Sequence, residues 1–221
     1  IVFEKPVELA AIYTKSSTPS APVIWNKKQY KKNLCKVLIV NSGNANAYTG
    51  DSGIVSIKKY STFAAKIFNC KLNEVFVSST GIIGEQLNPQ PIITKLKLIK
   101  KTKSKNLIHA AKAIMTTDTY PKIAVETVRI QDEKIKIYGI AKGSGMIAPN
   151  MGTMLSYIFI EAYLASSTLS ELLKTNIEDS FNAISVDGDM STNDTVAVFA
   201  VGNKKLKNTI KKHQFLKLIS T

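Results

Sequence analysis

Arginine is almost absent from this sequence of 221 residues: Arg129 is the only one, although the formal net charge is +14 at pH 7. The positive charge is therefore carried by lysines, which are spread over many segments. Because arginine is the preferred reader of phosphates and base edges, this distribution predicts a solvated basic surface in place of a nucleic-acid-binding site. Such a surface can still attract acidic substrates.

Histidine and cysteine are also scarce, with two of each. His109 falls on the flank of an expected helix and His213 in a lysine-rich tail, so neither position supports a histidine-centred catalytic triad. Cys35 and Cys70 show no metal-ligand spacing and no disulfide framework, and we expect two free thiols. No apolar run reaches the length of a membrane span, and no signal peptide is visible at the start. These absences favour a cytoplasmic protein.

Hydrophobic residues make up 44% of the chain, enough for a packed core. Short apolar runs alternate with segments of helical periodicity, and strands outnumber helices. This pattern predicts a layered α/β or α+β chain, without repeats or a clear linker. The expected strands are 8–14, 36–40, 74–77, 123–130, 134–141, 154–161 and 195–201, with a short extended segment at 21–25 and a turn or helix start at 26–32. The expected helices are 57–68, 106–115, 168–184 and one that begins at 206.

Two of these expectations are specific. The strands 123–130 and 134–141 should form a hairpin around a turn at 131–133. In the helix 168–184, Thr168 and Glu171 have the spacing of a capping box. The buried stripe expected for this helix consists of Leu169, Leu172, Leu173, Ile177, Phe181 and Ile184.

The stretch from Lys142 to Leu155, Lys-Gly-Ser-Gly-Met-Ile-Ala-Pro-Asn-Met-Gly-Thr-Met-Leu, joins two expected strands through residues that suit a sharp backbone path. Inside it, Gly152 precedes Thr153. A threonine hydroxyl is a poor nucleophile until a base activates it, and the amine of an N-terminal threonine can be that base. Such an amine forms only if the Gly152–Thr153 bond is cut. The alternative is an ordinary loop.

Two other interpretations of glycine-rich strings fail on the residues around them. Gly143–Ala148 fits a dinucleotide-binding fingerprint, but that fingerprint needs a helix at the glycines. Pro149 and Asn150 follow at once and leave no room for one. The string Asp-Gly-Asp-Met-Ser-Thr-Asn-Asp-Thr at 187–195 suggests a calcium loop. It has threonine at the sixth position and valine at the twelfth, where that loop needs glycine and glutamate.

Three further strings place small polar residues near strand or helix ends. Asn-Ser-Gly-Asn-Ala-Asn-Ala begins at Asn41, where asparagines and glycines can satisfy backbone groups in a turn. Thr80 and Gly81 follow a strand, and such a pair can direct an O–H and an N–H at one point, as an oxyanion hole requires. Thr116 lies in Met-Thr-Thr-Asp-Thr, which can also serve helix capping. Structural turns are the alternative for all three.

Taken together, five separated strings resemble, in order, the motifs of the ornithine acetyltransferase (glutamate N-acetyltransferase) family. The resemblance implies a self-processing N-terminal-threonine acetyltransferase fold with mixed sheets and flanking helices. It also implies cleavage between Gly152 and Thr153, where the family more often has alanine before the threonine. The expected products are an alpha-chain part, 1–152, and the beginning of a beta chain, 153–221. The chain looks shorter than the family at both ends.

The same resemblance implies the roles of single residues. Thr153 would carry an acetyl group from N-acetylornithine to glutamate in arginine biosynthesis. Thr80 and Gly81 would hold the oxyanion, and Thr116 and Lys142 would bind the substrate. No metal or cofactor is implied, and acetyl-CoA stays open as a second acetyl donor. The implied assembly is a heterotetramer of two alpha and two beta chains.

Three alternatives remain open at this level. The nearest is a related self-processing amidase or aminopeptidase, which would release acetyl to water. The second is an inactive fragment of an acetyltransferase. The most distant is a basic nucleic-acid-binding module, which would be retained on heparin in a salt-dependent manner.

Overall fold

The computed structural model of this chain describes residues 1–29, 33–101, 106–130, 133–146 and 154–204, and the strands described there form one mixed sheet. This confirms the expected layered α/β chain. The strands are β1 (Val2–Tyr13), β2 (Leu34–Asn44), β3 (Val75–Ile82), β4 (Lys122–Ile130), β5 (Glu133–Lys142), β6 (Leu155–Ile160) and β7 (Thr195–Ala200). The helices are α1 (Ala21–Gln29), α2 (Gly50–Ile67), α3 (Gln90–Lys101), α4 (Leu107–Ala113) and α5 (Ser166–Asn176). None of these helices has the length and apolarity to cross a membrane.

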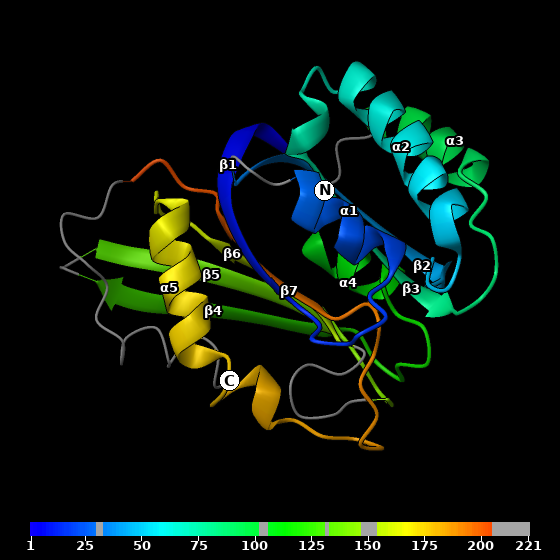
Figure 1. Cartoon of the computed structure of the whole chain (residues 1–221). Coiled ribbons are helices and arrows are strands. Elements are labelled where there is room, and N and C mark those ends of the chain that lie inside the picture. Colours follow the sequence, from blue (N-terminus) through cyan, green and yellow to red (C-terminus); the bar gives the residue numbers. More distant parts are fainter. Residues whose placement is uncertain (30–32, 102–105, 131–132, 147–153, 205–221) are drawn as a thin grey trace.

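The order of strands across the sheet is β3-β2-β1-β7-β6-β5-β4. The pairs β2–β3 and β6–β7 are parallel, and the other neighbours are antiparallel. The expected hairpin of β4 and β5 is confirmed. Strands β6 and β7 come after the central glycine-rich stretch in the sequence, yet they lie between β1 and β5, which come before it (Figure 1). The segments on the two sides of Gly152–Thr153 therefore share one sheet.

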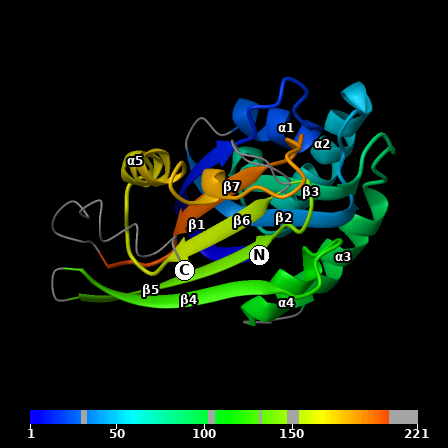
Figure 2. The ribbon, with the colours of Figure 1, turned by 90° about the horizontal axis from the view of Figure 1, so that it is seen from below.

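Each face of the sheet has its own apolar core. In β7, Val196 and Val198 pack into a core with α5, whereas Ala197 and Phe199 pack into a core on the opposite face. That second core contains Ala111 of α4, and Figure 2 shows α4 and α5 on opposite sides of the sheet. A third core lies between β2, β3 and the helices α1, α2 and α3. Because β6 and β7 are buried on both faces, their sequences are almost entirely apolar, with Ser156 and Thr195 as the exceptions.

The extended segment expected at 21–25 was wrong, because Ala21–Gln29 is helix α1. Pro22 lies in the first turn, where a missing N–H costs nothing and its fixed φ suits the helix. Asn26 is fully buried in this helix, and its side chain bonds the main-chain N–H and C=O of Val77. That pair of bonds docks α1 on β3, and a buried amide of this kind cannot be read from a lysine-rich sequence.

Helix α5 also differs from its prediction. It begins at Ser166, so Thr168 lies inside the helix and the expected capping box is absent. The carboxylate of Glu8, from β1, accepts the Ser166 N–H instead, at 3.1 Å. The helix ends at Asn176, where the chain turns through a 3-10 segment, Phe181–Ala183. As a result Ile184 is 44% exposed and does not belong to the buried stripe.

The other helices agree with their predictions to different degrees. Helix α2 starts at Gly50, seven residues before the expected start at 57. Helix α3 was not predicted, although Ile92, Leu96 and Ile99 recur at helical spacing; of its residues only Leu96 is buried. Helix α4 agrees with its prediction, and Asn106 caps it by accepting the Ile108 N–H. The helix expected from 206 lies outside the described residues.

Candidate functional site

Three of the residues singled out from the sequence meet in one cluster, in which Lys142 and Thr80 are buried and Thr116 is exposed. Lys142 ends β5, and its ammonium donates hydrogen bonds to the hydroxyl oxygens of Thr80, at 2.8 Å, and Thr116, at 3.0 Å. Thr80 comes from β3 and Thr116 from the segment after α4. Strands β2, β1, β7 and β6 separate β3 from β5 in the sheet. The sheet must therefore curl strongly for these two strand ends to meet.

The Lys142 side chain is unusual because it is charged and almost wholly enclosed, with 2% of the residue exposed. Burial lowers its pKa, and the nearby carboxylates of Asp118 and Asp194 act in the opposite direction. An ammonium has three N–H donors and no acceptor. Within the described part of the chain two of these donors are used, so one remains for a ligand.

Asp118 was not singled out from the sequence, yet it holds several parts of this cluster in place. One carboxylate oxygen accepts the Gly143 N–H at 2.8 Å and the Lys122 ammonium at 2.7 Å. The other accepts the Thr116 N–H at 3.3 Å. Burial acts to raise the pKa of Asp118, but these hydrogen bonds outweigh it and the pKa is lowered. The carboxylate is therefore ionised at neutral pH.

Gly81 marks a close approach between two strand ends. Its φ is +133°, and a Cβ at this position would clash with the main chain of Gly43, its partner in the register of β2 and β3. Only glycine fits there without moving the backbone. Thr80 is buried next to the exposed Gly81. The Asn-Ser-Gly string and the Thr-Gly pair therefore form one structural unit at this edge.

The string at 187–194 connects the other strings to one another. Asn193 donates its side-chain N–H groups to the carbonyls of Ala45, at 2.6 Å, and Ser79, at 2.8 Å. Asp187 accepts the Met146 N–H at 3.0 Å. The string therefore links these segments through a buried end at Asn193 and an exposed end at Asp187, a role that the sequence alone did not reveal.

Asp194, at the end of that string, is a second acid that sequence reasoning missed. It has no exposed surface and accepts the Met154 N–H at 2.9 Å. Burial raises its pKa to about 8, although the Met154 N–H, Ser191 and the Lys142 ammonium act to lower it. Asp194 is thus a group that can change charge near neutral pH, and it holds the first described residue after the central stretch.

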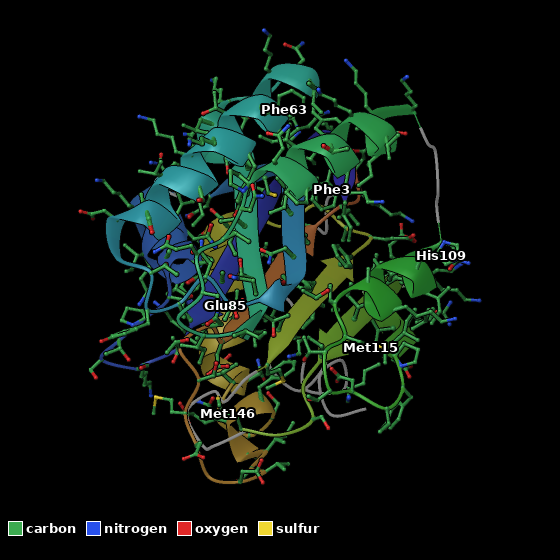
Figure 3. All side chains as sticks on the ribbon, turned by 90° about the vertical axis from the view of Figure 1, so that its right-hand side faces the viewer. Phe3, Phe63, Glu85, His109, Met115 and Met146 are labelled. Atoms are coloured by element: carbon green, nitrogen blue, oxygen red, sulfur yellow. The ribbon has the colours of Figure 1, made fainter. Side chains whose placement is uncertain are left out.

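Gly152 and Thr153 themselves lie outside the described residues. The nearest described residues on either side, Met146 and Met154, are held by Asp187 and Asp194. In Figure 3, Met115 and Met146 lie in the lower part of the view, and Phe63 lies near the top. Among the described residues no group of His, Cys, Asp or Glu could hold a metal ion.

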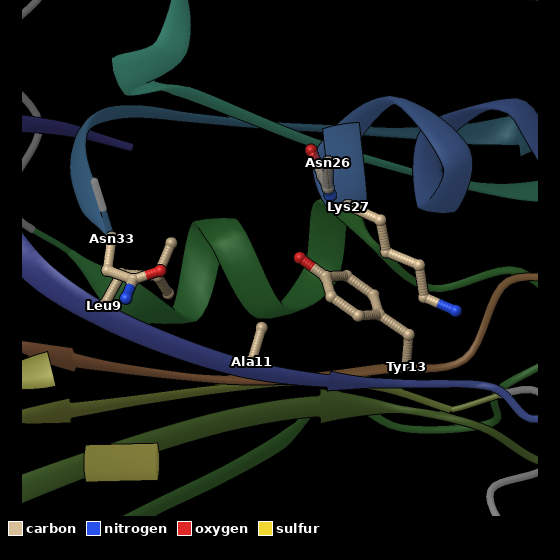
Figure 4. A pocket seen from close by; sticks show the side chains of 6 residues that line it. All are labelled: Leu9, Ala11, Tyr13, Asn26, Lys27 and Asn33. Atoms are coloured by element: carbon tan, nitrogen blue, oxygen red, sulfur yellow. The ribbon is translucent and has the colours of Figure 1, made fainter. Parts of the chain in front are cut away.

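Two cavities lie elsewhere. The first, about 210 Å³, is lined by Leu9, Ala11, Tyr13, Asn26, Lys27 and Asn33. Figure 4 shows the Tyr13 ring beside Lys27, whose ammonium is 5.7 Å from the ring centroid. The second, about 430 Å³, is lined by Phe3, Glu4, Lys5, Val7, Val201 and Asn203. Neither shares a residue with the Lys142 cluster, so neither adds a ligand-binding wall to it.

Comparisons of sequence agree along the whole chain. The sequence model described as the ArgJ family matches residues 1–221. "Arginine biosynthesis bifunctional protein ArgJ" of Bradyrhizobium diazoefficiens is 46% identical over 202 residues, covering 91% of this chain and 49% of that protein. The protein of the same name from Bartonella henselae is 44% identical over 205 residues, covering 92% of this chain and 50% of that protein. The chain thus spans about half the length of the curated relatives it matches.

Comparisons of structure point the same way. The crystal structure of the arginine biosynthesis bifunctional protein ArgJ from Bacillus halodurans has a TM-score of 0.62 at 33% identity, over 68% of this chain and 80% of that chain. Ornithine acetyltransferase from Mycobacterium tuberculosis, complexed with ornithine, has a TM-score of 0.58 at 26% identity, over 69% and 79%. The PH0078 protein of Pyrococcus horikoshii shares the fold alone, with a TM-score of 0.55 at 11% identity, over 99% and 69%.

Proposed function

This chain belongs to the ArgJ family, and on that basis we propose that it carries the acetyl-transfer machinery of an arginine-biosynthesis enzyme. The proposed reaction moves an acetyl group from N-acetylornithine to glutamate through an acetyl ester on Thr153. The observation that carries the proposal is the contact of Lys142 with both Thr80 and Thr116. It brings together, from three separate elements, the residues that the family resemblance assigns to oxyanion and substrate binding.

The cluster explains how the hydroxyl of Thr80 is aimed. Lys142 donates to the Thr80 oxygen, so that hydroxyl accepts from the ammonium and keeps its own proton free to donate. A donor of this kind, together with the Gly81 N–H, suits the negative oxygen of a tetrahedral intermediate. In other enzymes the loss of one such donor costs roughly 3–4 kcal/mol of transition-state stabilisation. The remaining N–H of Lys142 suits a substrate carboxylate.

The proposed chemistry has two half-reactions. The Thr153 hydroxyl attacks the acetyl carbonyl of N-acetylornithine while the Thr153 amine accepts the hydroxyl proton. The amide C–N bond breaks and the proton passes to the departing amine. Ornithine then leaves, and the acetyl group stays behind as an ester on Thr153. The amine of glutamate then attacks that ester and regenerates the threonine. No cofactor is needed, and acetyl-CoA could supply the same acetyl group as an alternative donor.

Formation of the Thr153 amine requires cleavage of the Gly152–Thr153 bond. We propose that the Thr153 hydroxyl attacks the Gly152 carbonyl, that an ester forms by an N→O shift, and that water splits it. The cut would give an alpha chain that contains 1–152 and a beta chain that begins with 153–221. Two alpha and two beta chains would remain associated. A native mass measurement of the assembly tests this stoichiometry.

The test of function uses the full-length polypeptide incubated with N-acetylornithine. Mass spectrometry should then show one acetyl group on the piece that begins with Thr153, and added glutamate should remove it as N-acetylglutamate. Release of acetate without transfer to glutamate would support the amidase alternative instead. Cleavage without any acetylated piece would contradict a covalent intermediate.

A further inference from the structure

We propose that Asp118 is a positioning residue that fixes the two substrate-binding residues and maintains the positive charge of Lys142. The inference deepens the proposed function and rests on it for the identity of the substrate. Asp118 lies two residues after Thr116 and four before Lys122, in a run of threonines that reads as a simple turn.

The carboxylate of Asp118 joins two segments that are distant in sequence. One oxygen holds the N–H of Gly143, directly after Lys142, and the other holds the N–H of Thr116. Each bond fixes the main chain at or next to a residue of the cluster. Asp118 itself is 8% exposed, and its bonds to Gly143 and Lys122 are 2.8 and 2.7 Å long. The Asp118 carboxylate thus links the main chain of Thr116 to the main chain next to Lys142, beside the direct bond between the two side chains.

The charge of Asp118 also acts on Lys142. Three charged groups influence the buried ammonium: Asp118 and Asp194 favour its protonated form, and Lys122 opposes it. Because a carboxylate ligand needs a cationic partner, Asp118 maintains the charge that the proposed substrate requires. Lys122, whose side chain is 33% exposed, forms an ion pair with Asp118. Its positive charge lowers the pKa of Lys142 and so partly offsets the effect of Asp118.

Two substitutions should therefore shift the titration of Lys142 in opposite directions. Asp118→Asn removes the favourable charge, so the pKa of Lys142 falls. Lys122→Met keeps the length of the side chain but removes the opposing charge, so the pKa of Lys142 rises. A purely structural loss would not produce shifts of opposite sign. Glu133→Gln is the matched control, because it breaks the exposed ion pair with Lys204 in another part of β5.

The experiment titrates the ¹³Cε chemical shift of Lys142 in the full-length protein, with Lys142→Met to assign the signal. In parallel, kcat and KM for N-acetylornithine are measured against pH. Asp118→Asn should raise KM about tenfold, as expected for the loss of a hydrogen bond to a charged group. It should also move the alkaline limb of kcat/KM to lower pH, whereas Lys122→Met should move that limb to higher pH. Glu133→Gln should leave both unchanged.

The proposal is overturned if the Lys142 titration is unchanged in Asp118→Asn, or is unchanged or lowered in Lys122→Met. If Asp118→Asn fails to fold, Asp118→Glu replaces it: this variant keeps the charge but moves the carboxylate, so it should raise KM without lowering the pKa of Lys142, and an unchanged KM would overturn the proposal. A wild-type protein that transfers no acetyl group would refute the proposed function. The Lys142 titration would still decide the role of Asp118, so the two failures are distinguishable.

Discussion

Asp194 shows how a single buried carboxyl couples this fold to pH. Its pKa is about 8 in the folded chain, whereas an unfolded aspartate titrates near 3.9. Between these values the folded state holds a proton that the unfolded state has released. The free energy of unfolding should therefore fall as the pH rises from about 4 to about 8, by up to roughly 1.4 kcal/mol per pH unit for one proton.

Asp194→Asn provides the test of this dependence. The amide keeps an acceptor for the Met154 N–H but cannot ionise, so the variant should lose less stability than the wild type between pH 5 and pH 8. Urea unfolding of both proteins at the two pH values measures the difference. Asp118 has a lowered pKa and stabilises in the opposite sense, but it is present in both proteins and cancels. Parallel curves would contradict the raised pKa of Asp194.

Thr153 carries the second prediction at this scale. If its hydroxyl attacks the Gly152 carbonyl, Thr153→Ala should give one uncut chain, and Thr153→Ser should still be cut. Thr80→Ala should slow the cut without unfolding the protein, because it removes a proposed oxyanion donor. A denaturing gel of the full-length proteins separates these outcomes. A Thr153→Ala protein that is still cut between these two residues would refute the mechanism.

At the scale of elements, the meeting of β2 and β3 depends on the absence of a side chain. Gly81→Ala adds a Cβ that clashes with the main chain of Gly43. The alanine would also be strained, because φ at this position is +133°. We expect a loss of at least about 2 kcal/mol in the free energy of unfolding. Gly84→Ala is the matched control, because its φ is also positive, at +89°, but no atom lies within 4 Å of the added Cβ. Equal losses in the two variants would show that the clash is relieved at no cost.

The strands could be predicted because their cause is local. Nearly continuous apolar runs such as that of β6 indicate burial on both faces. Helix α1 was missed because its inward face uses the amide of Asn26. Helix α3 was missed although its apolar residues follow helical spacing. The early end of α5 was missed for a similar reason, since the 3-10 turn at Phe181–Ala183 keeps an apolar residue in helical spacing.

The site could be predicted only as a set of strings. Thr80, Thr116 and Lys142 were identified through family motifs, and the structure brings these three together. Asp118 and Asp194 were not identified, because an aspartate among threonines or asparagines reads as a turn residue. Their importance comes from burial and from long-range partners, which depend on how the sheet curls and are not encoded in local spacing.

For the whole molecule, the arrangement of strands predicts what cleavage does to the assembly. Strand β6 pairs with β5, and β7 pairs with β1, in two antiparallel ladders that join the segments before and after Thr153. The cut pieces should therefore elute together in native size-exclusion chromatography and separate only in denaturant. The uncut Thr153→Ala protein is the control. In native buffer it should elute at the same volume as the cut wild type. Separation of the pieces in native buffer would contradict this sheet order.

The position of β6 and β7 between β1 and β5 also bears on the order of folding and cleavage. A piece that ended at 152 would present β1 and β5 as two open edges facing a gap, and open edges invite aggregation. The later strands could enter that gap only as a finished pair. If the chain is cut between Gly152 and Thr153, the uncut bond would keep β6 and β7 at high local concentration near that gap until they have paired with β5 and β1. Two halves synthesised from separate genes would lack that guidance and should accumulate as insoluble material.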